Sequence, residues 1–275
     1  MRHTELIFDG AHLRAVLHPG HSGLLVVTLD YRSTGKTDFS ADAHSTSFAR
    51  MGHAQLTLKS TANDWFINAD TPAFEAALAN VAARYDRVHM LGYSMGGYGA
   101  FRFAAALRAT SIVAVSPQVS IHPRTVPFDR RYRVEAAGFD PVLGDLALRP
   151  WPTLQGLMVI DPFIAPDRRH AMMLQALYPG VRIVRLGFGG HPATQVLRHA
   201  GKSWTVQREA AAAAASTKLI LKSHRSGRRQ SAGYWLRLAK RAQQARPGLA
   251  QYALDRAKAL GAQIPGQGTE RDTAG

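Results

Sequence analysis

Short, continuously apolar runs alternate along most of the chain with segments whose apolar residues recur at helical spacing. The run at 24–31, LLVVTLDY, has the unbroken apolar character of a strand that is covered on both faces. After Asp70 and Pro72, a typical helix start, Phe74 and Leu78 begin a helical spacing. The same reasoning predicts eight strands. They are 5–8, 13–18, 24–31, 54–59, 88–93, 111–116, 156–161 and 182–187.

The order of these elements predicts the class of the fold. The turn Asp9-Gly10 separates the first two strands and indicates an antiparallel start. The later strands alternate with helices, which favours a mainly parallel sheet with helices on both faces. Residues 118–150, rich in proline and charge, interrupt the alternation and predict an excursion over one end of the sheet, a candidate lid. The prediction is an α/β fold with an eight-stranded, mainly parallel sheet.

Composition narrows the class of protein. The 275 residues include no cysteine, which excludes disulfide frameworks and cysteine-based zinc sites. A content of 46% hydrophobic and 19% charged residues is typical of a globular chain. The longest apolar runs fall well short of the roughly 20 residues that a membrane span needs. The first residues do not resemble a signal peptide, so we expect a soluble cytoplasmic protein without a membrane span.

The excess of positive charge is concentrated at the C-terminal end. The formal net charge is +15. Residues 1–200 carry 20 basic and 15 acidic side chains, whereas residues 201–275 carry 14 and 4. We therefore expect a main domain over 1–205 and a basic helical extension over 206–275.

The extension contains two amphipathic segments, 234–245 and 249–260, on either side of a breaker at 246–248. They resemble one helix pair of the tetratricopeptide type. A single pair cannot bury its own apolar faces, so it is expected to dock on the main domain, on a protein partner or on a second copy of the chain. The basic stretch 218–229 comes with no nucleic-acid-binding motif, which argues against nucleic acid as a partner. The composition of 263–275 predicts a frayed tail.

Residues 92–96 are Gly-Tyr-Ser-Met-Gly, a G-x-S-x-G motif between a predicted strand and a predicted helix. A serine on so tight a turn is held in a strained conformation, with its hydroxyl projecting above the sheet. The glycines on either side remove side chains that would collide with the neighbouring strand and helix. The backbone N–H of Met95 points into the same space from the positive end of a helix, so we expect it to donate to an oxyanion. Ser94 is the candidate nucleophile.

With this motif in that context, the chain resembles the α/β-hydrolase superfamily. The resemblance covers residues 5–205 in the order of elements and is strongest at 88–103, VHMLGYSMGGYGAFRF. It implies a catalytic acid after the seventh strand and a catalytic histidine after the eighth. His191 lies in a glycine-rich loop after the last strand, where it would serve as general base to Ser94.

Two aspartates follow the seventh strand. Asp161 is preferred as the acid, because the D-x-x-[IV]-x-P pattern that begins there resembles the acid turn of the superfamily. Asp167 is the alternative, and it also suits a helix N-cap.

The oxyanion loop departs from the common pattern. Many members of the superfamily carry a His-Gly pair after the third strand, where this chain has Tyr31 and Arg32 after an aspartate. The second oxyanion donor is then the backbone N–H of Tyr31 or Arg32, and the competence of the loop is open. Trp65 and Phe66 follow the fourth strand at the same end of the sheet. They either form an apolar wall of the substrate pocket or pack under the neighbouring helix.

The sequence therefore predicts a serine hydrolase that cleaves a carboxylic ester or thioester of a small-molecule acyl substrate. In this hypothesis Ser94 is the nucleophile, His191 the base and Asp161 the orienting acid, with no metal and no organic cofactor. Residues 128–133, FDRRYR, either present arginines to an anionic substrate or form a solvated surface. Two alternatives remain open, because one fold hosts many functions. One is an acyltransferase, and the other is a non-catalytic protein that binds a partner through its helical tail.

Overall fold

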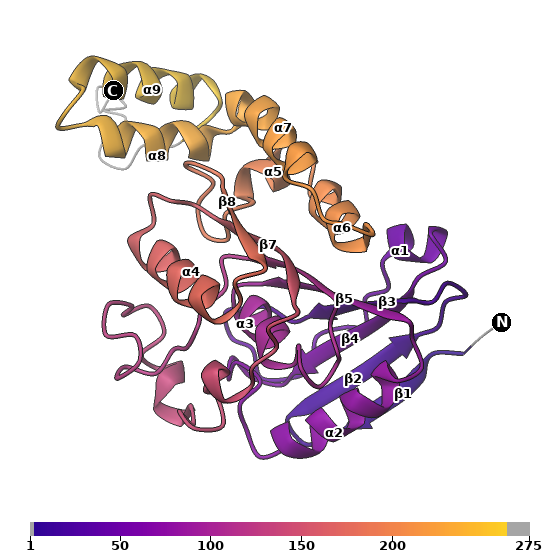
Figure 1. Cartoon of the computed structure of the whole chain (residues 1–275). Coiled ribbons are helices and arrows are strands. Elements are labelled where there is room, and N and C mark those ends of the chain that lie inside the picture. The colour runs from indigo at the N-terminus through magenta and orange to yellow at the C-terminus, as the bar shows by residue number, and fades with distance from the viewer. Residues whose placement is uncertain (1–2, 263–275) are drawn as a thin grey trace, which may run out of the picture.

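The computed structural model describes residues 3–262, and over this range the strands form one eight-stranded sheet (Figure 1). The strands are β1 (Glu5–Asp9), β2 (Leu13–His18), β3 (Leu24–Leu29), β4 (Ala54–Ser60), β5 (Arg87–Tyr93), β6 (Ser111–Val115), β7 (Gln155–Ile160) and β8 (Val181–Arg185). Their order is β1-β2-β4-β3-β5-β6-β7-β8. β2 runs antiparallel to both of its neighbours, and the other neighbouring strands are parallel. The predicted fold class is confirmed.

β3 ends at Leu29, earlier than predicted, because the next residue organises a loop. The Asp30 carboxylate accepts hydrogen bonds from the Lys36 ammonium at 3.0 Å and from the Ser40 hydroxyl at 2.7 Å. It also accepts one from the backbone N–H of Ser60 at 3.3 Å. These bonds fold the chain back after β3 and tie the loop to the end of β4.

Helices cover both faces of the sheet (Figure 1). Leu25 and Val27 of β3 belong to one apolar cluster, together with residues of α2, α3 and α4. Leu24 and Val26, the alternate residues of the same strand, belong to a second cluster with residues of α1, α5, α6 and α7. β3 is thus apolar at successive positions because it is buried on both faces, as predicted. The helices are α1 (Thr46–Arg50), α2 (Thr71–Ala82), α3 (Met95–Arg102), α4 (Ala165–Leu177), α5 (Gln195–His199), α6 (Trp204–Ala211) and α7 (Thr217–Gly227).

The segment between β6 and β7 forms the predicted excursion. It contains two short 3₁₀ turns, Glu135–Gly138 and Leu146–Leu148, and otherwise irregular chain. Its backbone is held against α3, because the Tyr98 hydroxyl donates to the carbonyl of Gly144 at 2.7 Å. Val126, Phe139 and Leu146 are buried in the first apolar cluster. The excursion is therefore packed onto the domain, with its own share of the core.

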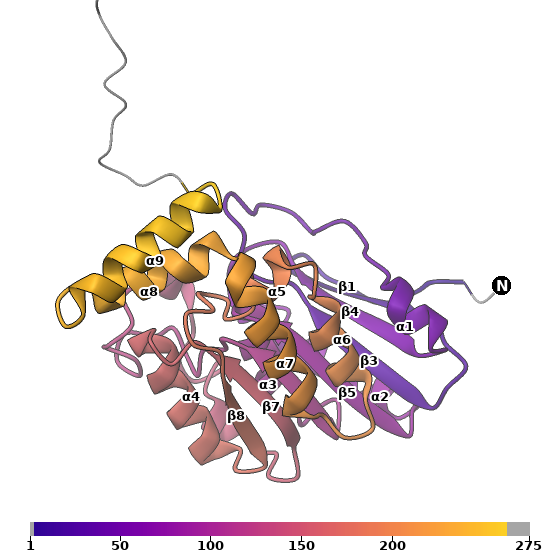
Figure 2. The same ribbon diagram turned by 90° about the horizontal axis from the view of Figure 1, so that it is seen from above.

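The C-terminal helices divide into two groups. α6 and α7 belong to the main core, because Val206 and Ile220 are fully buried against the second face of the sheet. The boundary expected at residue 205 thus falls inside α6 and does not separate two packing units. The last two helices, α8 (Ala232–Ala242) and α9 (Pro247–Ala259), pack on each other and project from the body (Figure 2). Both helices bury alanines, and Trp235 of α8 packs on Tyr252 of α9 with ring centroids 5.8 Å apart.

The predicted tail 263–275 lies outside the described residues. Over residues 3–262, no helix is long and apolar enough to cross a membrane.

Candidate active site

Ser94 occupies a sharp turn between β5 and α3. Its backbone has φ 50° and ψ −114°, a left-handed conformation that a residue with a side chain adopts only under constraint. The glycines on either side allow this turn. A Cβ on Gly92 would lie 2.1 Å from the carbonyl oxygen of Gly96, and one on Gly96 would lie 2.6 Å from that of Asp30. The turn therefore has the nucleophile-elbow geometry that the motif predicts.

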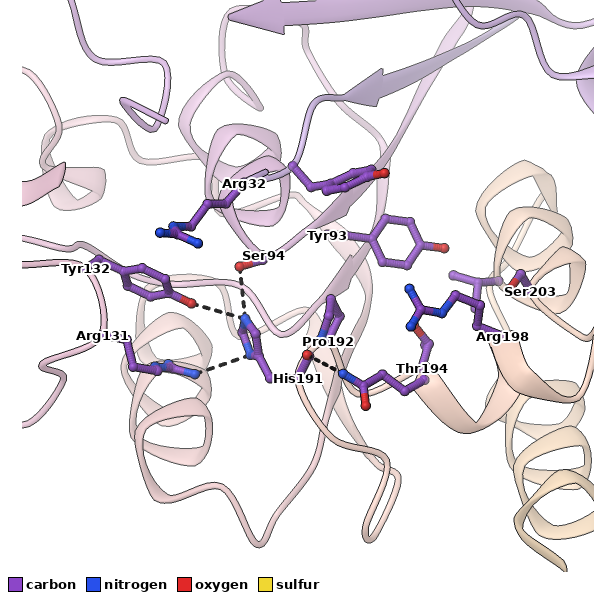
Figure 3. Close-up of a pocket in the computed structure, with 13 residues that line it drawn as sticks. Arg32, Tyr93, Ser94, Arg131, Tyr132, His191, Pro192, Thr194, Arg198 and Ser203 are labelled. Carbon is purple, nitrogen blue, oxygen red and sulfur yellow. Dashed lines mark hydrogen bonds between the residues drawn. The ribbon is translucent and has the colours of Figure 1, made fainter. Parts of the chain in front are cut away.

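The loop after β8 brings His191 to this serine. His191 Nε2 lies 3.0 Å from Ser94 Oγ (Figure 3). His191 Nδ1 lies 2.8 Å from Asp167 Oδ2. Asp167 is fully buried in the first turn of α4. Burial raises the pKa of its carboxyl, but the hydrogen bond and charge of His191 and the charge of Arg131 outweigh burial and leave the pKa below its ordinary value. Asp167 is thus an ionised partner for the imidazole.

Asp161, the preferred acid in the sequence, contacts the backbone instead. Its Oδ1 accepts hydrogen bonds from the N–H groups of Phe163 at 3.0 Å and Phe188 at 3.2 Å. Its Oδ2 accepts one from Gly190 at 2.9 Å. The expected contact between Asp161 and His191 is therefore wrong. The chain after β7 turns into α4 and brings the second aspartate under the imidazole, while the first fixes the loop that carries it.

A second charged group lies behind the histidine. Arg131 Nη1 is 2.7 Å from Asp167 Oδ1, and Arg131 Nη2 is 2.7 Å from Asp129 Oδ2. Asp129 also accepts from His170 Nε2 at 2.9 Å, since His170 Nδ1 is occupied by the backbone N–H of Val119 at 3.2 Å. Arg131 thus lies between two carboxylates, those of Asp129 and Asp167, and they compensate its positive charge.

Two further side chains reach the reacting atoms from the excursion. The Tyr132 hydroxyl lies 3.1 Å from His191 Nε2, and Gln118 Nε2 lies 3.5 Å from Ser94 Oγ. Gln118 is held in place by the Trp65 indole N–H, which donates to its Oε1 at 3.1 Å. Burial raises the pKa of Tyr132, so its phenol remains a donor. Tyr132 lies in the run 128–133, which the sequence singled out for its arginines and not for its phenol. No sequence signal pointed to Gln118.

The loop after β3 lies directly beside the elbow. The close approach of the Asp30 carbonyl to Gly96 brings Tyr31 and Arg32 to the rim of the space around Ser94, where both line the same cavity. The Arg32 side chain donates from Nε to Glu135 at 2.6 Å and so joins this loop to the excursion. The backbone of the loop thus lies beside the N-terminus of α3, which begins at Met95.

Comparison with known proteins bears on the fold. No protein-family model matches the chain, and no curated protein matches its sequence. Among solved structures, the capsule O-acetyltransferase of Neisseria meningitidis serogroup A is similar, with a TM-score of 0.50 and 11% identity over 73% of this chain and 93% of that chain. A histidine-to-alanine mutant of the same enzyme in complex with CoA gives a TM-score of 0.50 and 9% identity over 81% and 92%.

A further neighbour is Est1E from Butyrivibrio proteoclasticus with ferulic acid bound, with a TM-score of 0.47 and 16% identity over 74% of this chain and 98% of that chain. At 9–11% identity, the likeness to the O-acetyltransferase is one of fold. That likeness, the strand order and the serine turn support one conclusion. The chain has the α/β-hydrolase fold.

Ser94 lines a cavity at the carboxyl ends of the strands. The cavity has a volume of about 690 Å³ (Figure 3). Its lining residues are Tyr31, Arg32, Tyr93, Ser94, Arg131, Tyr132, His191, Pro192, Thr194, Gln195, Arg198, Ser203 and Val206. Over residues 3–262, no group of three or more histidine, aspartate or glutamate side chains is arranged to hold a metal ion.

Trp65 and Phe66, the expected pocket wall, do not belong to this lining. Both are fully buried. Phe66 packs edge-on against Phe103, with ring centroids 6.0 Å apart. Trp65 packs against Tyr132, with ring centroids 4.8 Å apart. The packing interpretation of these two residues is therefore the correct one, and Trp65 supports the cavity from behind.

Proposed function

We propose that the chain is a serine hydrolase that cleaves a carboxylic ester or thioester through an acyl-enzyme at Ser94. One observation carries the proposal: a serine on a constrained turn, 3.0 Å from an imidazole whose other nitrogen lies 2.8 Å from a buried carboxylate. A nucleophile, a base within hydrogen-bond reach and a group that orients the base are what acyl transfer to serine requires. We assign these roles to Ser94, His191 and Asp167.

In the first half of the reaction, Ser94 Oγ attacks the acyl carbon while His191 Nε2 takes the hydroxyl proton. The bond between the acyl carbon and the leaving oxygen or sulfur then breaks, and His191 returns the proton to the leaving group. In the second half, water attacks the acyl carbon and gives one proton to His191. The carboxylic acid departs as that proton returns to Ser94 Oγ.

Asp167 supports both halves. Its contact with Nδ1 favours the tautomer that leaves Nε2 free to accept a proton, and its charge stabilises the imidazolium that forms. For the oxyanion, we propose the backbone N–H of Met95 and that of Tyr31 or Arg32 as donors. The closeness of Gly96 to Asp30 supports this choice, because it brings the two backbone segments together beside the serine.

Labelling with a fluorophosphonate probe, followed by peptide mapping, tests the proposal. We expect the label on Ser94 and expect Ser94→Ala and His191→Ala to abolish both labelling and hydrolysis of p-nitrophenyl acyl esters. His199→Ala, an exposed histidine on α5, is the matched control and should keep both. A folded wild-type protein that neither labels nor hydrolyses esters would favour the non-catalytic alternative, with the helical tail as a partner-binding part.

Acyl transfer uses the same acyl-enzyme and differs only in the second nucleophile. The partition is measured by adding an alcohol or sugar acceptor and following the ratio of ester product to free acid. An acceptor that captures most of the acyl group at low concentration would identify a transferase. If free acid remains the main product whatever acceptor is added, the enzyme is a hydrolase.

A further inference from the structure

The charges that face the active-site cavity are all of one sign. Of the described residues, those that line it include Arg32, Arg131 and Arg198, and no aspartate or glutamate. Two of these arginines have their charge compensated. Arg32 pairs with Glu135 at 2.6 Å, and Arg131 lies between two aspartates, each 2.7 Å away.

Arg198 is different. Within residues 3–262, its guanidinium has neither an acidic nor a hydrogen-bonding partner. It extends from α5 into the cavity, on the opposite side of the serine–histidine pair from Arg32 (Figure 3). A guanidinium offers a planar fork of N–H donors that matches a carboxylate or a phosphate. Arg198 is exposed and lines the cavity, so its unpaired guanidinium is suited to binding an anion there.

Three hydroxyl groups share this side of the cavity with Arg198. They belong to Tyr93, Thr194 and Ser203, which are grouped around the arginine in Figure 3. In the part of the chain that the structure describes, none of these hydroxyls makes an intramolecular hydrogen bond. Burial raises the pKa of Tyr93, so its phenol stays protonated as a donor. The guanidinium and the three hydroxyls thus face the same part of the cavity, and their N–H and O–H groups are available to a ligand.

We infer that the substrate carries an oxyanion, a carboxylate or a phosphate, and that Arg198 binds it with help from the hydroxyls of Tyr93, Thr194 and Ser203. This inference rests on the proposed function and adds the substrate class to it. The reacting carbonyl lies at Ser94, and the stem between carbonyl and anion lies along the apolar ring of Pro192. Arg198 is then a specificity-determining residue that takes no part in proton transfer.

The test compares esters that differ only in an oxyanion. For the acyl part, the pair is p-nitrophenyl valerate and mono-p-nitrophenyl glutarate, which have acyl chains of equal length. For the alcohol part, para-tolyl acetate is compared with para-acetoxybenzoate and with para-acetoxyphenyl phosphate, which separates carboxylate from phosphate. Rates are measured for the wild type, Arg198→Ala and Arg198→Lys, with Ser94→Ala as the background. Arg241→Ala, an exposed arginine on α8, is the matched control.

We expect the wild type to prefer an anionic ester. Arg198→Ala should lower the ratio of kcat/KM for the anionic and neutral esters by about tenfold or more, the effect of losing a charge-assisted pair. Arg198→Lys should retain part of the preference, and Arg241→Ala should retain all of it. Added salt should reduce the wild-type preference, because screening weakens a partly exposed pair.

Two results would overturn the inference. One is a wild type that turns over neutral and anionic esters equally well, and the other is an Arg198→Ala variant with an unchanged ratio. If the folded wild type hydrolyses none of these esters, the proposed function fails, and calorimetric titration with glutarate and with inorganic phosphate decides the anion site separately. Binding that Arg198→Ala weakens supports the site, whereas absent or unaffected binding refutes it.

Discussion

The two aspartates after β7 differ in what their carboxylates accept. Asp167 faces the imidazole of His191, whereas both oxygens of Asp161 are used by backbone N–H groups of the loop that precedes the histidine. The contact of Asp167 affects where the imidazole of His191 carries its proton, whereas the contacts of Asp161 fix the position of the loop. Replacing each aspartate by asparagine should therefore have different effects.

We predict that Asp167→Asn lowers kcat by about 10³- to 10⁴-fold in a protein that still folds, because the amide favours the wrong imidazole tautomer. Asp161→Asn should instead lower the free energy of unfolding by about 1–3 kcal/mol, since the backbone N–H groups of the loop lose a buried, charged acceptor. Ester kinetics and thermal unfolding of both variants check this. The reverse pattern, with activity lost chiefly in Asp161→Asn, would restore Asp161 as the acid.

The choice between these aspartates shows where sequence reasoning ends at the residue scale. Ser94 could be assigned because the flanking glycines and the strand–turn–helix context are local, and His191 because it follows the last strand. The acid could not be decided in this way. It depends on how the chain between Asp161 and Asp167 turns into α4, and a motif that begins at the first aspartate does not determine that turn.

Acid should destabilise the fold through the aspartates behind the active site. Burial raises the pKa of both carboxyls, but their partners lower it by more, so each pKa lies below its ordinary value. The partners are His191 and Arg131 for Asp167, and His170 and Arg131 for Asp129. A carboxyl with a lowered folded pKa stabilises the fold above its unfolded pKa and loses that contribution as pH falls through the folded value.

Thermal unfolding from neutral pH down to about pH 3 should therefore show a steep loss of stability below about pH 4. In Asp167→Asn the loss over the same interval should be smaller, because that variant has one titrating carboxyl fewer. An equally steep loss in both proteins would mean that Asp167 titrates alike in the folded and unfolded states.

At the scale of elements, helix α8 is connected to the histidine loop. Arg237 donates to the carbonyl of Gly189 at 3.4 Å and to the side-chain oxygen of Gln195. Gln195 in turn donates to the carbonyl of His191 at 2.6 Å. Burial lowers the pKa of Arg237, and the charge of Asp161 opposes that effect. A helix that the sequence assigns to an appendage thus holds the backbone of the proposed base.

We predict that Arg237→Ala lowers kcat by about 10- to 100-fold while KM changes little, because His191 moves away from Ser94. Arg241→Ala, an exposed arginine on the same helix, is the control for charge and helix propensity. Steady-state kinetics with a neutral ester and thermal unfolding distinguish positioning from stability. A variant that loses thermal stability but keeps kcat would give Arg237 a structural role only.

The strands and most of the helices could be predicted because their signals are local. The excursion between β6 and β7 was expected, but the course of its backbone could not be predicted, since it is held by contacts such as Tyr98 with Gly144 and has no periodic pattern. From this segment Tyr132 reaches His191 and Gln118 reaches Ser94, and for the same reason the sequence did not indicate either contact. The arginine at 237 was missed because its partners lie far away in sequence.

At the scale of the whole molecule, the charge pattern and the packing give different ends for the main domain. Charge distribution places a boundary at residue 205, but α6 and α7 cover the face of the sheet formed by Leu24, Val26 and their neighbours. Each large side chain removed from such an interface costs about 1.5–3 kcal/mol, and the strand residues it covered become exposed as well. Against a typical total stability of about 5–15 kcal/mol, this loss is decisive.

We therefore predict that a chain of residues 1–205 does not unfold cooperatively, whereas a chain of residues 1–230, which keeps α6 and α7, does. The longer chain should still hydrolyse esters with a reduced kcat, because it lacks Arg237 but retains the serine, histidine and aspartate. Circular dichroism melts and ester kinetics on both chains check this. If the 1–205 chain melted cooperatively at the temperature of the full-length protein, α6 and α7 would be dispensable covers, and the domain would end where the charge pattern suggests.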